Sequence, residues 1–165
     1  MMLRGASNLL VGMLLLLVAG CGFHLRGAAN LPESINTMYI QGINLKRDLG
    51  LALKRGLESN DVTIIEQPQT GAAVLTVLSA KSERRVLSVG ANAKVSEYQL
   101  YGTLEFKLLD KNNQLVVDSE TLRAVRDYQF DQNQVLASDQ QDAQLRQEIN
   151  DQLVQSLLRR LSAIQ

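Results

Sequence analysis

The side chains with the greatest potential for chemistry lie close together near the N-terminus. Cys21 is the only cysteine of the chain and His24 is its only histidine. A cysteine thiolate is a strong nucleophile, so Cys21 could act in catalysis, accept a lipid or remain a buried thiol. His24 could serve as a general base only if other groups held its imidazole in position. The residues around the pair distinguish these uses.

An apolar segment leads directly into Cys21. Residues 9–19 form an uninterrupted run of small and apolar residues, and Arg4 is the only charged residue before it. A transmembrane helix needs about 20 predominantly apolar residues. A secretory signal peptide has a positive start and a shorter apolar core, as this segment does. A membrane-tethering helix with an incidental cysteine is the alternative.

The sequence LVAGC (residues 17–21) resembles the lipobox of bacterial lipoproteins. The resemblance implies cleavage before Cys21 and the attachment of three acyl chains, where two membrane signals already suffice for stable anchoring. Gly22 stands where an Asp commonly retains lipoproteins in the inner membrane, which favours the outer membrane. We therefore expect a signal peptide at residues 1–20, lipidation of Cys21 and a lipidated tether at residues 21–34.

Length and composition predict one domain behind this tether, at residues 35–165. Removing residues 1–20 leaves 145 residues, enough for a hydrophobic core. These residues include 16 basic and 17 acidic ones, which gives no positive excess for nucleic acid or an anionic bilayer. Three Phe, four Tyr and no Trp offer few rings for stacking on bases or sugars. We expect no nucleic-acid binding.

The sequence carries no recognisable pattern for catalysis, a metal or a cofactor. No cluster of His, Cys and carboxylates has metal-ligand spacing, and no glycine-rich phosphate-binding motif is present. Acidic residues such as Glu97 and Glu105 fall on the polar side of a predicted strand, where charges normally face water. We therefore expect a protein that is not an enzyme, with no catalytic residue, metal site or cofactor.

Hydrophobic periodicity predicts the elements of the domain. In chain order these are a strand at 37–40, a helix behind Asn44 that ends before 59–61, an extended piece at 62–65, a buried strand at 73–80, a long half-buried strand at 98–108, its hairpin partner at 115–130, and a helix at 138–164. This order predicts an α+β fold, a two-layer sandwich with both helices on one face of the sheet. The hairpins would be antiparallel, and the strand–helix–strand start would add a parallel pair.

Two features could bind a partner. Basic residues occur at 81–85, Lys94, Arg123 and Arg126, and some would gather near one end of the sheet if the strands lie side by side. Arginine guanidinium groups suit phosphates, although a scattered basic surface paired with neighbouring acids is the alternative. Residues 129–155 also hold nine glutamines. They would form either a solvated surface or a polar surface that docks inside a water-filled protein lumen.

The expected mature start resembles a known family. GCGFHLRGAANLPESINTMYI (residues 20–40) is similar to the start of the lipopolysaccharide (LPS)-assembly lipoprotein family LptE. In that family an aromatic residue, His, Leu and Arg follow Cys-Gly, and a proline precedes the first strand, as Pro32 does here. EYQ (residues 97–99) and LLRRLSAI (residues 157–164) also match, and the order of elements agrees along the whole chain.

The resemblance implies more than the residue pattern does. It implies two helices packed on one face of a mostly antiparallel four-stranded sheet. It also implies an outer-membrane lipoprotein that plugs the LptD β-barrel, helps this barrel assemble and binds LPS for delivery to the outer leaflet. The action would be binding rather than catalysis. The competing class is an adaptor lipoprotein of another envelope lipid-transport or secretion complex.

Candidate LPS contacts are Arg85, Lys94 and Arg123. The family pattern has one basic residue shortly before the Glu-Tyr-Gln stretch, for which Lys94 is the candidate, displaced by a few positions. A second basic residue near the start of the closing helix has no match at residues 136–140.

Overall fold

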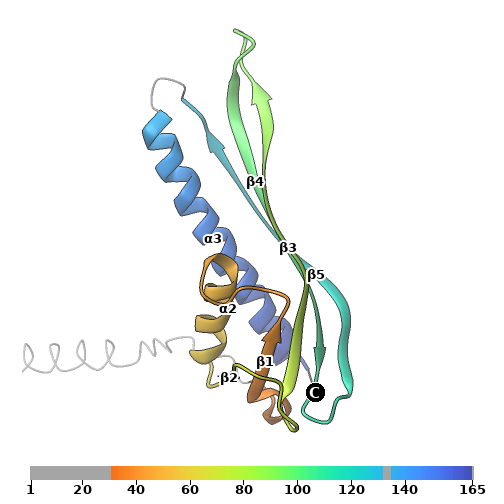
Figure 1. Ribbon diagram of the computed structural model, residues 1–165. Helices are drawn as coiled ribbons and strands as arrows, with labels where there is room; N and C mark the ends of the chain where they lie inside the picture. The colour runs from red at the N-terminus through yellow and green to blue at the C-terminus, as the bar shows by residue number, and fades with distance from the viewer. Residues whose placement is uncertain (1–30, 132–134, 165) are drawn as a thin grey trace, which may run out of the picture.

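The computed structural model describes residues 31–131 and 135–164, so the expected signal peptide, Cys21 and His24 lie outside the described residues. The elements are η1 (Glu33–Ile35), β1 (Thr37–Gln41), α2 (Asp48–Glu58), β2 (Thr63–Ile65), β3 (Ala73–Val89), β4 (Val95–Leu109), β5 (Leu115–Gln129) and α3 (Val135–Ser162). Figure 1 shows α2 and α3 on one side of a long twisted sheet. The predicted α+β fold with two helices on one face of a sheet is confirmed.

The sheet has five strands and is mixed, so the expectation of four mostly antiparallel strands is wrong. Its order is β2-β1-β3-β4-β5. β1 pairs in parallel with both β2 and β3, whereas β3–β4 and β4–β5 are antiparallel. The additional strand, β2, forms because α2 returns the chain alongside β1 in the same direction, where the Thr63 N–H donates to the Asn36 carbonyl at 2.8 Å.

Helix α2 begins at Asp48, later than expected from its apolar pattern. The side chain of Asn44 accepts a hydrogen bond from the Lys46 N–H at 2.9 Å, which closes a local turn instead of capping a helix. From Asp48 onward the helix buries Leu49, Leu53 and Leu57 against the sheet. The periodicity therefore identified the buried face correctly but not the first turn.

The core lies between the sheet and the two helices. Strand β4 buries every second residue from Leu100 to Leu108, which confirms the period of two predicted for it. Helix α3 has 28 residues and is therefore about 42 Å long. Its Ile149 and Leu153 lie over Gly102 of β4, and its Val154 and Leu158 lie against Gly56 of α2. The buried apolar residues of α3 are Ile149, Leu153, Val154, Leu157, Leu158 and Leu161.

Strand β3 continues to Val89, well past its expected end at residue 80. β1 ends at Gln41 and β2 at Ile65, so only β3, β4 and β5 continue to the far end of the molecule (Figure 1). We call this three-stranded part, residues 79–89, 95–105 and 121–129, the arm. Periodicity missed the arm portion of β3 because residues 80–87 are all exposed and carry no apolar run.

Candidate functional site

The helices leave one face of the sheet uncovered, and we call it the open face. In the arm, the register places three rows of residues on it: Lys81–Thr103–Arg123, Glu83–Tyr101–Val125 and Arg85–Gln99–Asp127. The intervening rows, such as Arg84–Leu100–Arg126, belong to the face beneath α3, because side chains alternate along a strand.

This alternation divides the basic residues into two groups. Arg84 and Arg126 face α3, where they lie 3.6 Å from Asp142 and 3.5 Å from Glu148. Lys81, Arg85 and Arg123 belong to the open face instead. The basic residues that were expected to lie together are thus divided between the two faces of the sheet. Arg84 and Arg126 contact acids of α3, and Lys81, Arg85 and Arg123 face outward.

The outward cations differ in their availability. Arg85 forms an ion pair with Glu83 at 2.8 Å and lies 5.0 Å from the ring centroid of Tyr101. The hydrogen bond with Glu83 raises the pKa of Arg85, and the same bond lowers the pKa of Glu83. Within the part of the chain that the structure describes, neither Lys81 nor Arg123 has an ion pair. These two cations can therefore bind an anion without breaking an existing pair.

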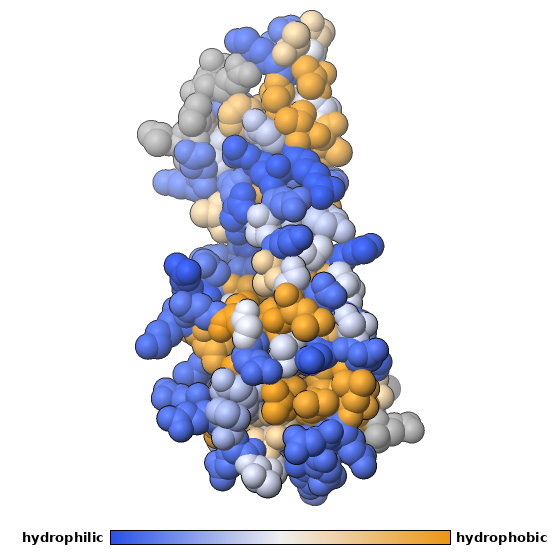
Figure 2. Space-filling model, turned by 45° about the vertical axis from the view of Figure 1, so that its right-hand side comes forward, coloured by the Kyte–Doolittle hydropathy of each residue, from blue (hydrophilic) through white to orange (hydrophobic). Residues whose placement is uncertain are grey.

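An apolar row crosses the open face near the base of the sheet, below the arm. The register aligns one residue from each of the five strands, Ile65, Tyr39, Val74, Leu109 and Leu115. Leu115 is 56% exposed and the other four are half-buried. Figure 2 shows a face of the molecule on which apolar patches in the lower half and near the far end are separated by hydrophilic residues.

Lys94 lies in the turn between β3 and β4 at the tip of the arm. The Gly90 N–H donates to the Lys94 carbonyl at 2.7 Å and closes this turn. Lys94 lines a shallow hollow of about 500 Å³ together with Ser96 and Phe130. The side chain of Lys94 is exposed.

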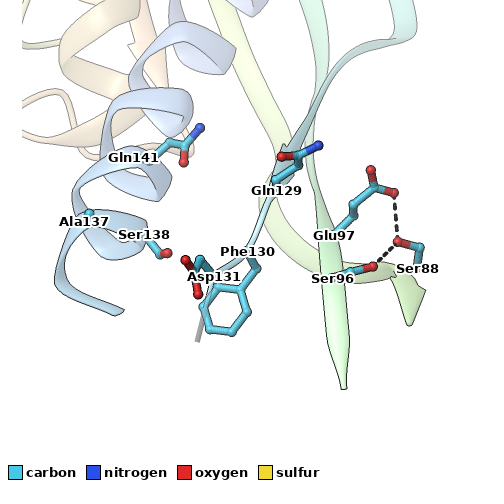
Figure 3. A pocket seen from close by; sticks show the side chains of 9 residues that line it. All are labelled: Ser88, Ser96, Glu97, Gln129, Phe130, Asp131, Ala137, Ser138 and Gln141. Atoms are coloured by element: carbon cyan, nitrogen blue, oxygen red, sulfur yellow. Dashed lines mark hydrogen bonds between the residues drawn. The ribbon is translucent and has the colours of Figure 1, made fainter. Parts of the chain in front are cut away.

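A neighbouring hollow of about 500 Å³ shares Ser96 and Phe130 and reaches the start of α3 at Ser138. Figure 3 shows Ser138 and Phe130 on facing elements around it. On its other side Ser88 lies 2.7 Å from Ser96 and donates to Glu97 at 2.8 Å. Its described lining residues include no cation.

Of the three candidate LPS contacts, Arg85 and Arg123 lie in the arm and Lys94 lies in the turn at its tip, so they do not form one compact cluster. Arg85 pairs with Gln99, and Arg123 pairs with Thr103. These β4 residues are four positions apart, which separates the two rows by about 13 Å. Lys94 lies just outside β4, beyond both rows. A ligand that contacts all three must be extended along the arm.

A polar cluster centred on the buried Asp142 holds α3 against the arm. Asp142 of α3 accepts hydrogen bonds from Tyr128 at 3.0 Å and from Arg146, and it faces Arg84. Arg84 also stacks on Tyr98, with 4.5 Å from its guanidinium carbon to the ring centroid. A hydrogen bond with Tyr128 raises the pKa of Arg84, and burial raises the pKa of Tyr128. Sequence reasoning missed this cluster because no local pattern relates Asp142 to a residue of β3.

Residues 31–131 and 135–164 hold no group of three or more His, Cys, Asp or Glu that could bind a metal ion. Neither described helix is long and apolar enough to cross a membrane.

Comparison with known proteins identifies the family. A family model described as "LptE: Lipopolysaccharide-assembly" matches residues 35–161. The LPS-assembly lipoprotein LptE of Pectobacterium atrosepticum is 31% identical over 158 residues, which cover 95% of this chain and 85% of the relative. The chain belongs to the LptE family. The LptE of Photorhabdus laumondii is 29% identical over 162 residues, with the same coverage of both chains.

Solved structures of lipoproteins share the fold. A minor lipoprotein of Acinetobacter baumannii is 29% identical and superposes with a TM-score of 0.66, covering 80% of this chain and 94% of its own. Lipoprotein B of Nitrosomonas europaea is 26% identical with a TM-score of 0.69, covering 86% of this chain and 91% of its own. LptE membership makes the chain a lipoprotein of LPS assembly in the Gram-negative envelope. It also confirms the expectation that the chain is not an enzyme.

Proposed function

We propose that this LptE-family chain is an outer-membrane lipoprotein, lipidated at Cys21, that plugs the LptD barrel, helps it assemble and binds LPS for delivery to the outer leaflet. The observation that supports this role best is the open face, an uncovered sheet surface with three outward cations in the arm and an apolar row at its base. The interior of a transmembrane barrel is polar, so a narrow domain with a largely polar face suits it.

LPS binding would use charge rather than catalysis. Arg85, Lys94 and Arg123 are distributed along the arm and would contact the anionic sugar-phosphates of LPS. Guanidinium groups bind phosphate through two parallel hydrogen bonds, which adds geometric specificity to the charge. Arg123 can do so directly, whereas Arg85 must first exchange its bond with Glu83.

The tether would supply the membrane attachment. Lipidation of Cys21 would hold the domain at the inner leaflet beside its barrel, which raises the effective concentration of each for the other. The domain then needs less intrinsic affinity for the barrel than a free partner would.

Affinity purification of the tagged, lipidated protein from envelope extract in mild detergent tests the plug role. We expect a stoichiometric large β-barrel, identified by mass spectrometry, that survives washing. Recovery of the lipoprotein alone, or with an inner-membrane transporter, would contradict the plug role and favour an adaptor lipoprotein of another complex.

Charge reversal tests the LPS contacts separately. Replacing Arg85, Lys94 and Arg123 together by Glu should reduce LPS capture at least about tenfold while the barrel still co-purifies, since removing one charged hydrogen-bond partner costs about 1.5–3 kcal/mol. The matched control replaces Lys46, Arg55 and Arg159, three exposed cations outside the arm, by Glu. Unchanged LPS capture by the arm variant, or an equal loss in the control, would contradict these assignments.

A further inference from the structure

Strand β3 has a free edge over most of its length. β1 pairs with β3 up to the Gln41–Thr76 partners and then ends. Gly42 has φ +88° and turns the chain away, and a Cβ on it would lie 2.1 Å from the Val77 carbonyl oxygen. Beyond this point, among the residues that the structure describes, β3 pairs only with β4. Alternate N–H and C=O groups of residues 78–89 therefore point toward a position that β1 has left.

The central part of this edge is regular. Irregularities in the pairing with β4 occur between Val77 and Ser79 and again after Val86, while the register from Ser79 to Val86 is unbroken. These eight residues span about 27 Å. A hollow of about 560 Å³ lies where the free edge begins, lined by residues 42–44 and 78–82 among others. The edge is thus straight enough, and open enough at its start, to accept another strand.

Its side chains indicate the chemistry of the partner. On the open face, residues 79–86 carry Lys81 and Arg85 against a single acid, Glu83, while Arg84 faces Asp142 of α3. Charges on an edge strand oppose pairing with an identical edge, because a second copy brings the same positive excess. A segment with carboxylates complements this edge instead. The exposed apolar side chains Leu78, Val86, Leu87 and Val89 lie at the two ends of the charged stretch.

We propose that the free edge of β3, residues 79–86, binds an extended acidic segment of the barrel partner by strand addition. The inference rests on the proposed function, which supplies the barrel. A closed barrel wall has no free strand edge, so the segment is a loop or a terminus that reaches into the lumen. Backbone hydrogen bonds to β3 supply the binding energy, and Lys81, which has no ion pair among the described residues, selects the carboxylates.

Proline substitution at two neighbouring positions tests the backbone contact. Of two consecutive residues in an antiparallel strand, one directs its N–H toward the paired strand and the other away from it. Of Ser82→Pro and Glu83→Pro, one therefore removes a bond to β4, and the other removes only a donor of the free edge. We expect the variant that loses the N–H of the free edge to keep the wild-type circular dichroism. It should recover less than about a tenth of the wild-type amount of barrel, a loss equivalent to about 1.4 kcal/mol or more in binding free energy.

Ser82→Ala and Glu83→Ala are the controls, because they remove the side chains and keep both N–H groups. Ser82→Ala should recover the barrel at wild-type levels, and Glu83→Ala at wild-type levels or above, because it removes the single acid of the edge. A folded proline variant that also does so overturns strand addition while leaving the plug role intact. If the wild type recovers no barrel, the proposed function fails and this inference fails with it.

Hydrogen exchange supplies a second measurement should both proline variants unfold. In the captured complex, amides in residues 79–86 should exchange more slowly than in the isolated protein. Unchanged exchange in a complex that contains the barrel overturns the proposal. The isolated protein gives a further outcome that overturns the proposal. If amide exchange in residues 79–86 becomes slower as the concentration of the isolated protein rises, the free edge binds a second copy of the chain instead of the barrel.

Discussion

Arg84 and Arg85 are neighbours in sequence but have different surroundings. Because strand side chains alternate, Arg84 lies under α3 against Asp142 and Tyr98, whereas Arg85 belongs to the open face with Glu83 and Tyr101. The first arginine therefore helps to hold the helix, and the second faces outward, where a ligand must compete with its bond to Glu83. A charge count along the sequence treats the two as equivalent.

The Asp142 cluster predicts a large stability loss on removal of the carboxylate. Asp142→Ala leaves the Tyr128 hydroxyl, Arg146 and Arg84 without their shared acceptor. We expect a loss of about 2–4 kcal/mol in the free energy of unfolding, measured by urea denaturation of a form that begins after Cys21. The exposed Asp139 is the control, and Asp139→Ala should change stability by about 0.5 kcal/mol or less. Equal effects of both substitutions would refute this role.

The raised pKa of Tyr128 determines how the free energy of unfolding should change at alkaline pH. Burial, with Asp142 adding to it and Arg84 opposing it, raises the pKa of Tyr128 above its ordinary value of 10.0. The protonated phenol is therefore favoured by folding, so its contribution is complete below about pH 10 and is lost as pH rises through the folded-state pKa. Urea denaturation between about pH 8 and pH 11 should show a steeper decline for the wild type than for Tyr128→Phe. Parallel curves would contradict this assignment.

The packing of α3 on β4 depends on a residue without a side chain. Gly102 lies on the buried face of β4, and a Cβ there would come 2.3 Å from Ile149 Cγ2 and 3.3 Å from Leu153 Cδ1. The glycine thus allows the long helix to lie close to the arm. Arg160 of the same helix bonds to Glu120 of β5 at 2.6 Å and adds a polar contact nearer its end.

Gly102→Ala tests this close approach. The added methyl group must displace Ile149, so we expect a loss of about 1–3 kcal/mol in the free energy of unfolding by urea. In an Ile149→Ala background the same substitution should cost less, because the clashing atom is gone, and the pair should be non-additive by about 0.5 kcal/mol or more. Strict additivity would show that α3 does not rest on Gly102.

The molecule as a whole is long and narrow rather than spherical. Strand β3 alone has 17 residues and spans about 55 Å. The described chain enters at the base, where η1 precedes β1, and the arm extends away from that end (Figure 1). This places the apolar row near the end where the described chain begins and the cationic rows farther from it.

Cys21→Ser tests the anchor on which this arrangement depends. The variant should lack the acyl mass and keep its signal peptide, because serine cannot replace the cysteine as lipid acceptor. Intact-mass spectrometry and membrane fractionation check both results. A variant that is still cleaved and still bound to membranes through the N-terminus would contradict the lipobox.

Local patterns were enough to predict the class of fold and the family. The period of two in residues 98–108 and the apolar spacing of the two helices indicated which faces are buried, because burial follows side-chain periodicity. The residues around Cys21, together with those at 97–99 and 157–164, carried the resemblance to the LptE family. These features depend on residues that are close in sequence.

Periodicity indicated an extended piece at 62–65, but its place in the sheet as β2, the length of the arm and the Asp142 cluster required the folded chain. β2 has three residues and forms only because β1 is beside it, and residues 79–89 of β3 are strand because β4 pairs with them. Asp142 meets Arg84 because α3 crosses the arm. Likewise, the exposure of Arg85 and Arg123 on one uncovered face follows from strand register. Such long-range pairings depend on partners far along the chain, so no local window of sequence contains them.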